Sequence, residues 1–78
     1  MNDLPTRDIR ARFGEAVRKR RKELNLSQED FAERAELHRT YISDIERGTR
    51  NISLENIEKL ATALDLTLSQ LIQRVDHQ

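Results

Sequence analysis

Apolar residues recur along the chain at intervals of three and four positions, the spacing that places them on one face of a helix. No stretch sustains the alternation of apolar and polar residues that is typical of a β-strand. Glycine occurs twice and proline once, so few positions would interrupt a helix away from its ends. The pattern predicts an all-α fold of five helices joined by short turns.

The first predicted helix covers about 8–24. Its apolar stripe consists of Ile9, Phe13, Val17 and Leu24. Thr6 is a candidate N-cap, and Asp8 in the first turn suits the positive end of the helix. Gly14 stands inside the helix at a cost of about 1 kcal/mol relative to alanine, so we expect another helix to pass close to it. Asn25 suits the left-handed conformation that ends a helix.

Two short helices are predicted next. Ser27 is a good N-cap for a helix over 28–35. After a gap of three or four residues, a helix over 39–47 stops at Gly48. The apolar side chains that these two helices turn inward are Phe31, Ala32, Ala35, Ile42 and Ile45. Two short helices joined by so tight a turn predict a helix-turn-helix.

The last two predicted helices both carry strong apolar faces. Ser53 caps the fourth helix, and its stripe consists of Leu54, Ile57, Leu60, Ala61 and Leu64. Thr67 and Gln70 have the spacing of a capping box, and the fifth helix runs from there to about Val75. Its stripe consists of Leu68, Leu71, Ile72 and Val75. Because the fourth helix already supplies a full inward face, we interpret the stripe of the fifth as the interface of a homodimer rather than as monomer core.

The composition argues against several classes of protein. One domain covers 1–78, with its core at about 8–75 and short flexible ends. Cysteine is absent and only His38 and His77 are histidines, so no disulfide framework, metal site or other cofactor is expected. No apolar run is long enough to span a membrane and the first residues do not resemble a signal peptide, so the expected location is the cytoplasm.

Charge is balanced over the whole chain but uneven along it. The 14 basic and 14 acidic residues cancel, which argues against a general affinity for polyanions. Positive charge gathers in the run Arg18-Lys19-Arg20-Arg21-Lys22. Such a run is either a solvated helix face or a surface that steers phosphates, and the sequence leaves both interpretations open.

The helix predicted over 39–47 presents a compact polar face. With its apolar residues turned inward, the outward residues are Thr40, Ser43, Asp44 and Arg47, and Arg39 stands at the flank of the first turn. The guanidinium of Arg39 can donate hydrogen bonds to O6 and N7 of one guanine at the same time. Thr40 and Ser43 can reach base edges or a thymine methyl group. Asp44 is repelled by phosphates, yet it can accept from a cytosine amino group. The face therefore predicts base contacts in the major groove of double-stranded DNA.

The segment LSQEDFAERAELHRTYISDIERG resembles the helix-turn-helix of the lambda-repressor-like family, also called XRE-type or Cro-type. The resemblance rests on Leu26-Ser27-Gln28-Glu29, Phe31-Ala32, Ile42-Ser43, Ile45-Glu46 and Gly48. Within that family, the run from Arg39 to Ser43 followed by Arg50-Asn51 is most similar to the controller proteins of restriction-modification systems. One position departs from the pattern, because Glu36 stands where a glycine is usual and the left-handed conformation costs a non-glycine residue roughly 1 to 2 kcal/mol.

The resemblance also implies roles for individual residues. It implies that Gln28 bonds a phosphate and braces the start of the recognition helix, and that Arg21 and Glu46 form a structural ion pair between the first and third helices. The residues that it places at the DNA backbone, together with the outward Arg47, are Gln28, Tyr41, Arg47, Arg50 and Asn51. For Tyr41, packing at the edge of the core is an equal alternative.

The function predicted from these features is that of a sequence-specific transcriptional regulator that binds a palindromic operator as a homodimer. A contact with RNA polymerase is compatible with that function. The alternative is an antitoxin-like module for protein interaction, with autoregulatory DNA binding. An enzyme is not expected, because no set of nucleophile, base and orienting group is present and His38 is interpreted as a cap or turn residue.

Overall fold

The computed structural model describes residues 8–78 and folds them into five helices. In chain order these are α1 (Ile9–Glu23), α2 (Gln28–Ala35), α3 (Arg39–Arg47), α4 (Leu54–Ala63) and α5 (Leu68–Asp76). The predicted all-α fold is confirmed. The N-terminal arm predicted before residue 8, with Thr6 as a candidate cap, lies outside the described residues, and the N-cap of α1 is Asp8.

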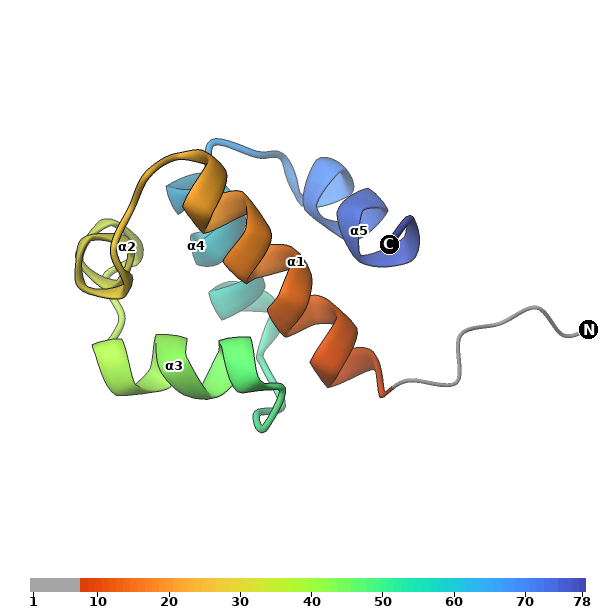
Figure 1. The fold of residues 1–78 in the computed structure, drawn as a ribbon, viewed down its shortest axis with the longest axis horizontal. Coiled ribbons are helices and arrows are strands. Elements are labelled where there is room, and N and C mark those ends of the chain that lie inside the picture. Colours follow the sequence, from red (N-terminus) through yellow and green to blue (C-terminus); the bar gives the residue numbers. More distant parts are fainter. Residues whose placement is uncertain (1–7) are drawn as a thin grey trace, which may run out of the picture.

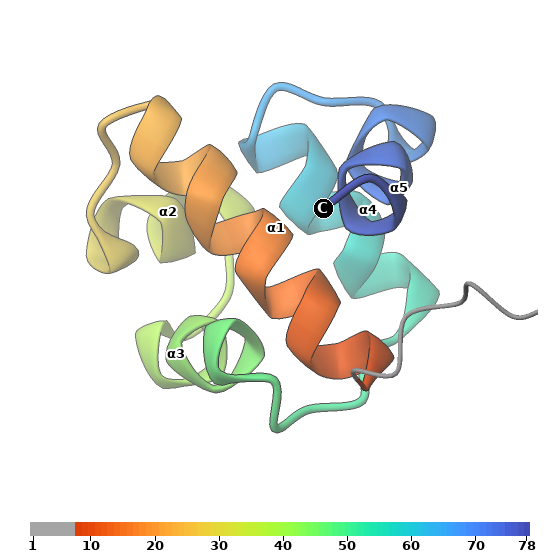
Figure 2. The same ribbon diagram turned by 45° about the vertical axis from the view of Figure 1, so that its right-hand side comes forward.

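α1 runs through the middle of the molecule (Figures 1 and 2). α3 and α5 lie on opposite sides of it, and α4 lies behind it in Figure 1, in contact with both α2 and α5. α1 packs directly against α3 and α5, while α2 packs against α3 and α4. α3 thus lies along one edge of the molecule, far from α5.

Local sequence signals account for most of the helix ends. Ser27, Ser53 and Thr67 each accept a hydrogen bond from a backbone N–H in the first turn of their helix, as predicted. Thr67 and Gln70 form the full capping box. The left-handed residues that end helices are Asn25, Glu36, Gly48 and Asp65, with φ of 58°, 58°, 77° and 59°. Glu36 therefore accepts the left-handed conformation, and the sequence analysis did not find Asp65.

A hydrophobic core lies where the five helices meet. Its largest fully buried side chains are Phe31, Ile42, Ile45, Leu60, Leu64, Leu71, Val17 and Val75. In the stripes of α1 and α4, two residues are outside it, because Ile9 is 55% exposed and Leu54 is 79% exposed. Each is the first residue of its helix, where the apolar stripe extends past the packed part of the neighbouring helices.

α1 and α3 approach each other very closely at Gly14. A Cβ atom added to Gly14 would lie 2.2 Å from the carbonyl oxygen of Ile45 and 2.9 Å from that of Glu46. These are backbone atoms of α3, so no flexible side chain can move aside. The expected close helix approach is confirmed, and only glycine allows this crossing.

The stripe of α5 divides into a buried and an exposed half. Leu71 and Val75 are buried against the other helices, so assigning them to a dimer interface was wrong. The reason is that α5 packs on α1 as well as on α4, and two helices cover more of its surface than α4 alone. Leu68 and Ile72 are each 43% exposed and remain on the outside.

Candidate nucleic-acid interface

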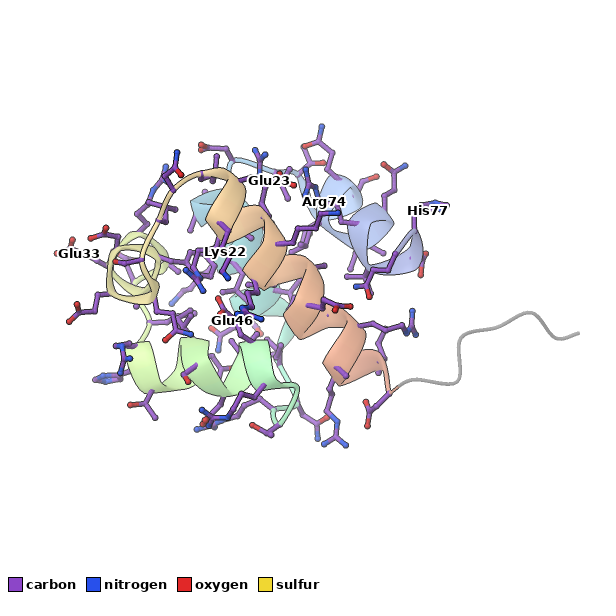
Figure 3. All side chains as sticks on the ribbon, in the orientation of Figure 1. Lys22, Glu23, Glu33, Glu46, Arg74 and His77 are labelled. Carbon is purple, nitrogen blue, oxygen red and sulfur yellow. The ribbon has the colours of Figure 1, made fainter. Side chains whose placement is uncertain are left out.

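A buried ion pair fixes α3 against α1. Arg21 Nε lies 2.7 Å from Glu46 Oε2, and its Nη2 lies 3.0 Å from Glu46 Oε1. The third nitrogen of Arg21, Nη1, donates to the carbonyl oxygen of Leu26 at 2.8 Å. The two charged side chains are only 9% and 4% exposed. This is the ion pair implied by the resemblance, and Figure 3 shows Glu46 between α1 and α3.

Gln28 joins the same ion pair from the start of α2. Its side-chain Nε2 donates to Glu46 Oε1 at 3.1 Å. Because Glu46 belongs to the last turn of α3, Gln28 braces the end of the recognition helix, and the implied contact with its start is corrected. The second proton of the amide is still available to a phosphate oxygen.

The turn between α2 and α3 is held by backbone hydrogen bonds. The N–H of Leu37 donates to the carbonyl of Ala32 at 2.9 Å, and the N–H of Glu36 donates to that of Glu33 at 3.2 Å. This is the pattern of a helix end with a left-handed residue, here Glu36. The partly buried Leu37 packs against the core, so the turn sets the angle at which α3 leaves α2.

The start of α3 differs from the start of α2. His38 occupies the N-cap position of α3 without a side-chain hydrogen bond, and the first turn contains no acidic residue. At the start of α2, Ser27 caps the helix and the first turn contains Glu29 and Asp30. The positive end of the α3 dipole is therefore less compensated, which favours the approach of a phosphate or a base acceptor.

The outward face of α3 places the predicted base readers side by side. Arg39 and Thr40 are exposed in the first turn, and Ser43 is half-buried one turn further on. Arg39 makes no ion pair or side-chain hydrogen bond with the described residues, so its five N–H donors are available. The face therefore presents a fork-shaped donor and two short hydroxyl groups, as the sequence predicted.

Asp44 does not present an open carboxylate on this face. Its Oδ1 pairs with Arg47 Nη2, and its Oδ2 lies 3.3 Å from Arg50 Nε. Arg47 also donates through Nη1 to Ser43 Oγ at 2.8 Å. In this conformation both carboxylate oxygens have arginine partners, and the acceptance of a hydrogen bond from a base by Asp44 stays a prediction.

Tyr41 lies on the flank of α3 that faces α4. Its ring packs against the core, and its hydroxyl accepts from Asn56 Nδ2 at 3.1 Å. The guanidinium of Arg50 lies 4.9 Å from the ring centroid, a cation–π distance. Since the hydroxyl accepts from Asn56, its own proton is left to donate to a DNA phosphate. The two alternatives for Tyr41 are thus compatible.

Sequence reasoning missed Asn56 and the contact between Gln28 and Glu46. Asn56 belongs to α4 and lies 15 positions after Tyr41, so no helical spacing connects them. Gln28 and Glu46 are 18 positions apart. Both contacts follow from the packing of different helices, for which a single sequence contains no direct signal.

The basic run at the end of α1 has mixed roles. Arg21 forms the buried ion pair, and Arg20 donates through Nε to the carbonyl of Leu64 at 3.0 Å. Glu23 pairs with Arg20 at 3.2 Å and with Arg74 of α5 at 2.9 Å, as Figure 3 shows for Glu23 and Arg74. Hydrogen bonds from Arg74 and then from Arg20 lower the pKa of Glu23. The remaining three, Arg18, Lys19 and Lys22, are exposed.

Other kinds of site find little support in residues 8–78. In that part of the chain, no three histidine, cysteine or acidic side chains are grouped as ligands for a metal ion. None of the helices described there has the length and apolar character needed to cross a membrane.

The fold and the polar face of α3 define a small DNA-binding regulator of transcription. A family model described as Helix-turn-helix matches residues 17–71, and the chain belongs to that family. Control protein C.BamHI of Bacillus amyloliquefaciens is 54% identical over 68 residues, which cover 86% of this chain and 84% of that protein. Control protein C.MunI of Mycoplasma sp. is 49% identical over 72 residues, which cover 91% and 97%.

A solved structure agrees with these relatives. The restriction-modification controller protein C.AhdI from Aeromonas hydrophila superposes with a TM-score of 0.77 at 47% identity. The match covers 80% of this chain and 94% of that one. The chain is therefore similar to control proteins in sequence and in fold.

Proposed function

We propose that this protein is a control protein of the restriction-modification type, which binds a palindromic operator as a homodimer. The observation that supports this best is the exposed polar face of α3 on a helix fixed by the buried pair of Arg21 and Glu46. A recognition helix must be held rigidly, because base readout depends on hydrogen-bond geometry.

Base reading is assigned to three residues of α3. Arg39 bonds a guanine bidentately, and Thr40 and Ser43 contact base edges or a thymine methyl group. All three are on one side of the helix, and Arg39 is exposed. The start of a helix with exposed donors is the part that usually enters the major groove.

Phosphate contacts are assigned to the residues around this face. They are Gln28, Tyr41, Arg47, Arg50 and Asn51. These contacts fix the position of the protein on the duplex but read no sequence. They also show how a chain with zero net charge could bind a polyanion, since Arg39, Arg47 and Arg50 supply positive charge locally around this face.

The homodimer interface is assigned to the exposed half of the α5 stripe. Leu68 and Ile72 are one helical turn apart and equally exposed, so they form a short apolar strip on one side of α5. α5 lies on the opposite side of α1 from α3, so pairing through α5 leaves both recognition helices uncovered (Figure 2). A two-fold dimer matches a palindromic operator with half-sites about one helical turn, roughly 34 Å, apart.

Two further expectations belong to this proposal. The protein acts in the cytoplasm, where bacterial DNA lies, and it regulates without catalysing a reaction. A contact between a DNA-bound dimer and RNA polymerase would give activation as well as repression. The antitoxin alternative would require a toxin as main partner, and the relatives named above are control proteins.

Two measurements test the proposal. Selection of bound duplexes from random DNA should return a palindrome, whereas an unrelated set of sequences would contradict operator recognition. Sedimentation equilibrium at micromolar concentration should give a dimer that Ile72→Glu converts to monomer. Ile9→Glu is the matched control, because Ile9 is also an exposed isoleucine but belongs to α1. A wild-type monomer, or a dimer unaffected by Ile72→Glu, would contradict the interface.

A further inference from the structure

Asp44 is the only acidic residue among the outward positions of α3, and two arginines proposed to hold DNA converge on it. Each of its carboxylate oxygens takes one arginine, Oδ1 from Arg47 and Oδ2 from Arg50. Arg47 continues to the Ser43 hydroxyl. We call this arrangement of Ser43, Asp44, Arg47 and Arg50 the Asp44 clasp.

Burial within the clasp is uneven. The Asp44 side chain is 18% exposed, whereas those of Arg47 and Arg50 are 61% and 48% exposed. The arginines therefore cover the carboxylate and keep much of their own surface in solvent. Arg50 uses only Nε in the clasp, and Arg47 still has the N–H of its own Nε. Both guanidinium groups have donors left for a second anion.

The backbone holds Asp44 in place as well. The N–H and the hydroxyl of Thr49 both bond to the carbonyl oxygen of Asp44, at 3.1 Å each. These bonds close the end of α3 and bring the following loop, with Arg50, back beside the helix. The ring of Tyr41 also supports Arg50, with its centroid 4.9 Å from the guanidinium carbon. The clasp therefore has a defined geometry before DNA is bound.

We propose that Asp44 determines specificity without reading a base, by positioning Arg47 and Arg50 for phosphates in the operator register while its charge weakens binding to all other DNA. The inference rests on the proposed function. The repulsion between carboxylate and phosphates acts on every duplex, because it depends on charge alone. The positioning raises affinity only on the operator. There the base contacts fix the register, so a phosphate lies where each positioned arginine can reach it.

The clasp also links phosphate contact to base reading. In the described conformation, the Ser43 hydroxyl accepts from Arg47. That bond leaves the proton of the Ser43 hydroxyl to donate to an acceptor on a base edge. By holding Arg47, the clasp thereby also orients the hydroxyl of Ser43.

The test is Asp44→Asn, which removes the charge and keeps the shape of the side chain. Binding to operator and to scrambled duplex is measured by fluorescence anisotropy over a range of salt concentrations. Random DNA should bind more tightly, with a log–log salt slope steeper by about one unit for each arginine released. The ratio of operator to random affinity should fall by about tenfold, because one charge-assisted hydrogen bond contributes about that factor to affinity. The matched control is Glu33→Gln on the outer side of α2, which changes net charge equally and should keep the ratio (Figure 3).

A spectroscopic measurement makes the test independent of any loss of stability. The Arg50 Nε–H signal in a 15N-edited NMR spectrum should be protected from exchange in the free wild type and lose that protection in Asp44→Asn. An unchanged affinity ratio, or an unprotected signal in the wild type, would overturn the inference. So would an Asp44→Asn variant that alters preference at a single base pair, since Asp44 would then read a base. A wild type without any sequence preference would instead reject the proposed function.

Discussion

The guanidinium of Arg21 in α1 holds the carboxylate of Glu46 in α3 through two hydrogen bonds of 2.7 and 3.0 Å. Gln28 adds a third bond to the same carboxylate from the start of α2. The three helices whose relative positions determine DNA contact therefore share one buried polar junction. Buried charges of this kind are costly to separate, because the remaining partner cannot be solvated.

Arg21→Met should lower the stability of the fold. It leaves Glu46 charged and without its main partner in a nearly inaccessible place, which costs about 3 to 5 kcal/mol. In a domain of this size, that corresponds to a fall in melting temperature of roughly 10 °C or more. Thermal unfolding followed by circular dichroism measures the melting temperature.

Arg34→Met is the control. Arg34 and Asp65 pair at 3.6 Å on the surface, and this pair should contribute less than about 1 kcal/mol to stability. Equal melting temperatures for the two variants would refute the structural role of Arg21.

Gly14→Ala should destabilise the protein although alanine is the better helix former. The gain in helix propensity is about 1 kcal/mol. Against it, the new Cβ would lie 2.2 Å from the Ile45 carbonyl oxygen and force α1 and α3 apart, and overpacking costs about 1 to 3 kcal/mol or more. Because separation also strains the Arg21 junction, the loss should exceed the gain.

Urea unfolding of Gly14→Ala beside Lys19→Ala gives the comparison. Lys19 is exposed on the same helix, so its replacement by alanine should change stability by only a few tenths of a kcal/mol. A Gly14→Ala variant as stable as the wild type would mean that the helices do not approach as closely as described.

Glu36→Gly should stabilise the turn of the helix-turn-helix. Glu36 has a φ of 58°, and relief of that left-handed strain gains about 1 to 2 kcal/mol. The unfolded chain gains entropy from glycine, which offsets about 0.4 to 1 kcal/mol. A net rise of a few degrees in the melting temperature is expected from calorimetry, with operator affinity unchanged. A fall in melting temperature would indicate that Glu36 makes a stabilising contact in solution.

These cases show what a single sequence can predict. Caps and stripes depend on residues a few positions apart, so Ser27, Ser53 and Thr67 were found together with most of the core. Gly14 was predicted to be a site of close helix approach, because a glycine inside a helix lowers its stability and close packing explains why it is there. Contacts between helices give no such local signal. The burial of Leu71 by α1 depends on how the helices pack, so the sequence placed Leu71 at an interface. The pairing of Asp44 with Arg50 depends on the path of the loop after α3, which the sequence analysis did not predict.

The N-cap of α1 should titrate at unusually low pH. Hydrogen bonds from the side chain and the backbone of Arg10 lower the pKa of Asp8 from 3.8 to about 2. A lowered folded-state pKa means that the cap stabilises the helix above pH 3.8 and loses this effect as the pH falls through about 2. A 13C NMR titration of the Asp8 carboxyl measures the midpoint. Arg10→Gln should raise that midpoint towards 3.8, because it removes the largest cause, and an unchanged midpoint would contradict the assignment.

The most direct test of the account separates base reading from phosphate contact by comparing Arg39→Ala with Arg50→Ala. Arg39 starts α3 and has all its donors available, whereas Arg50 follows the helix and lies over Tyr41. Binding of both variants to operator, to half-site variants and to random duplex is titrated at several salt concentrations.

Arg39→Ala should cost roughly 1 to 3 kcal/mol on the operator, relax the preference at one base pair in each half-site and leave random binding nearly intact. Arg50→Ala should weaken binding to the operator and to the half-site variants alike, without changing preference at any base pair, and reduce the operator salt slope by about one unit. If Arg39→Ala instead lowers every affinity equally while base preference survives, Arg39 contacts the DNA backbone, and α3 does not read the operator as proposed.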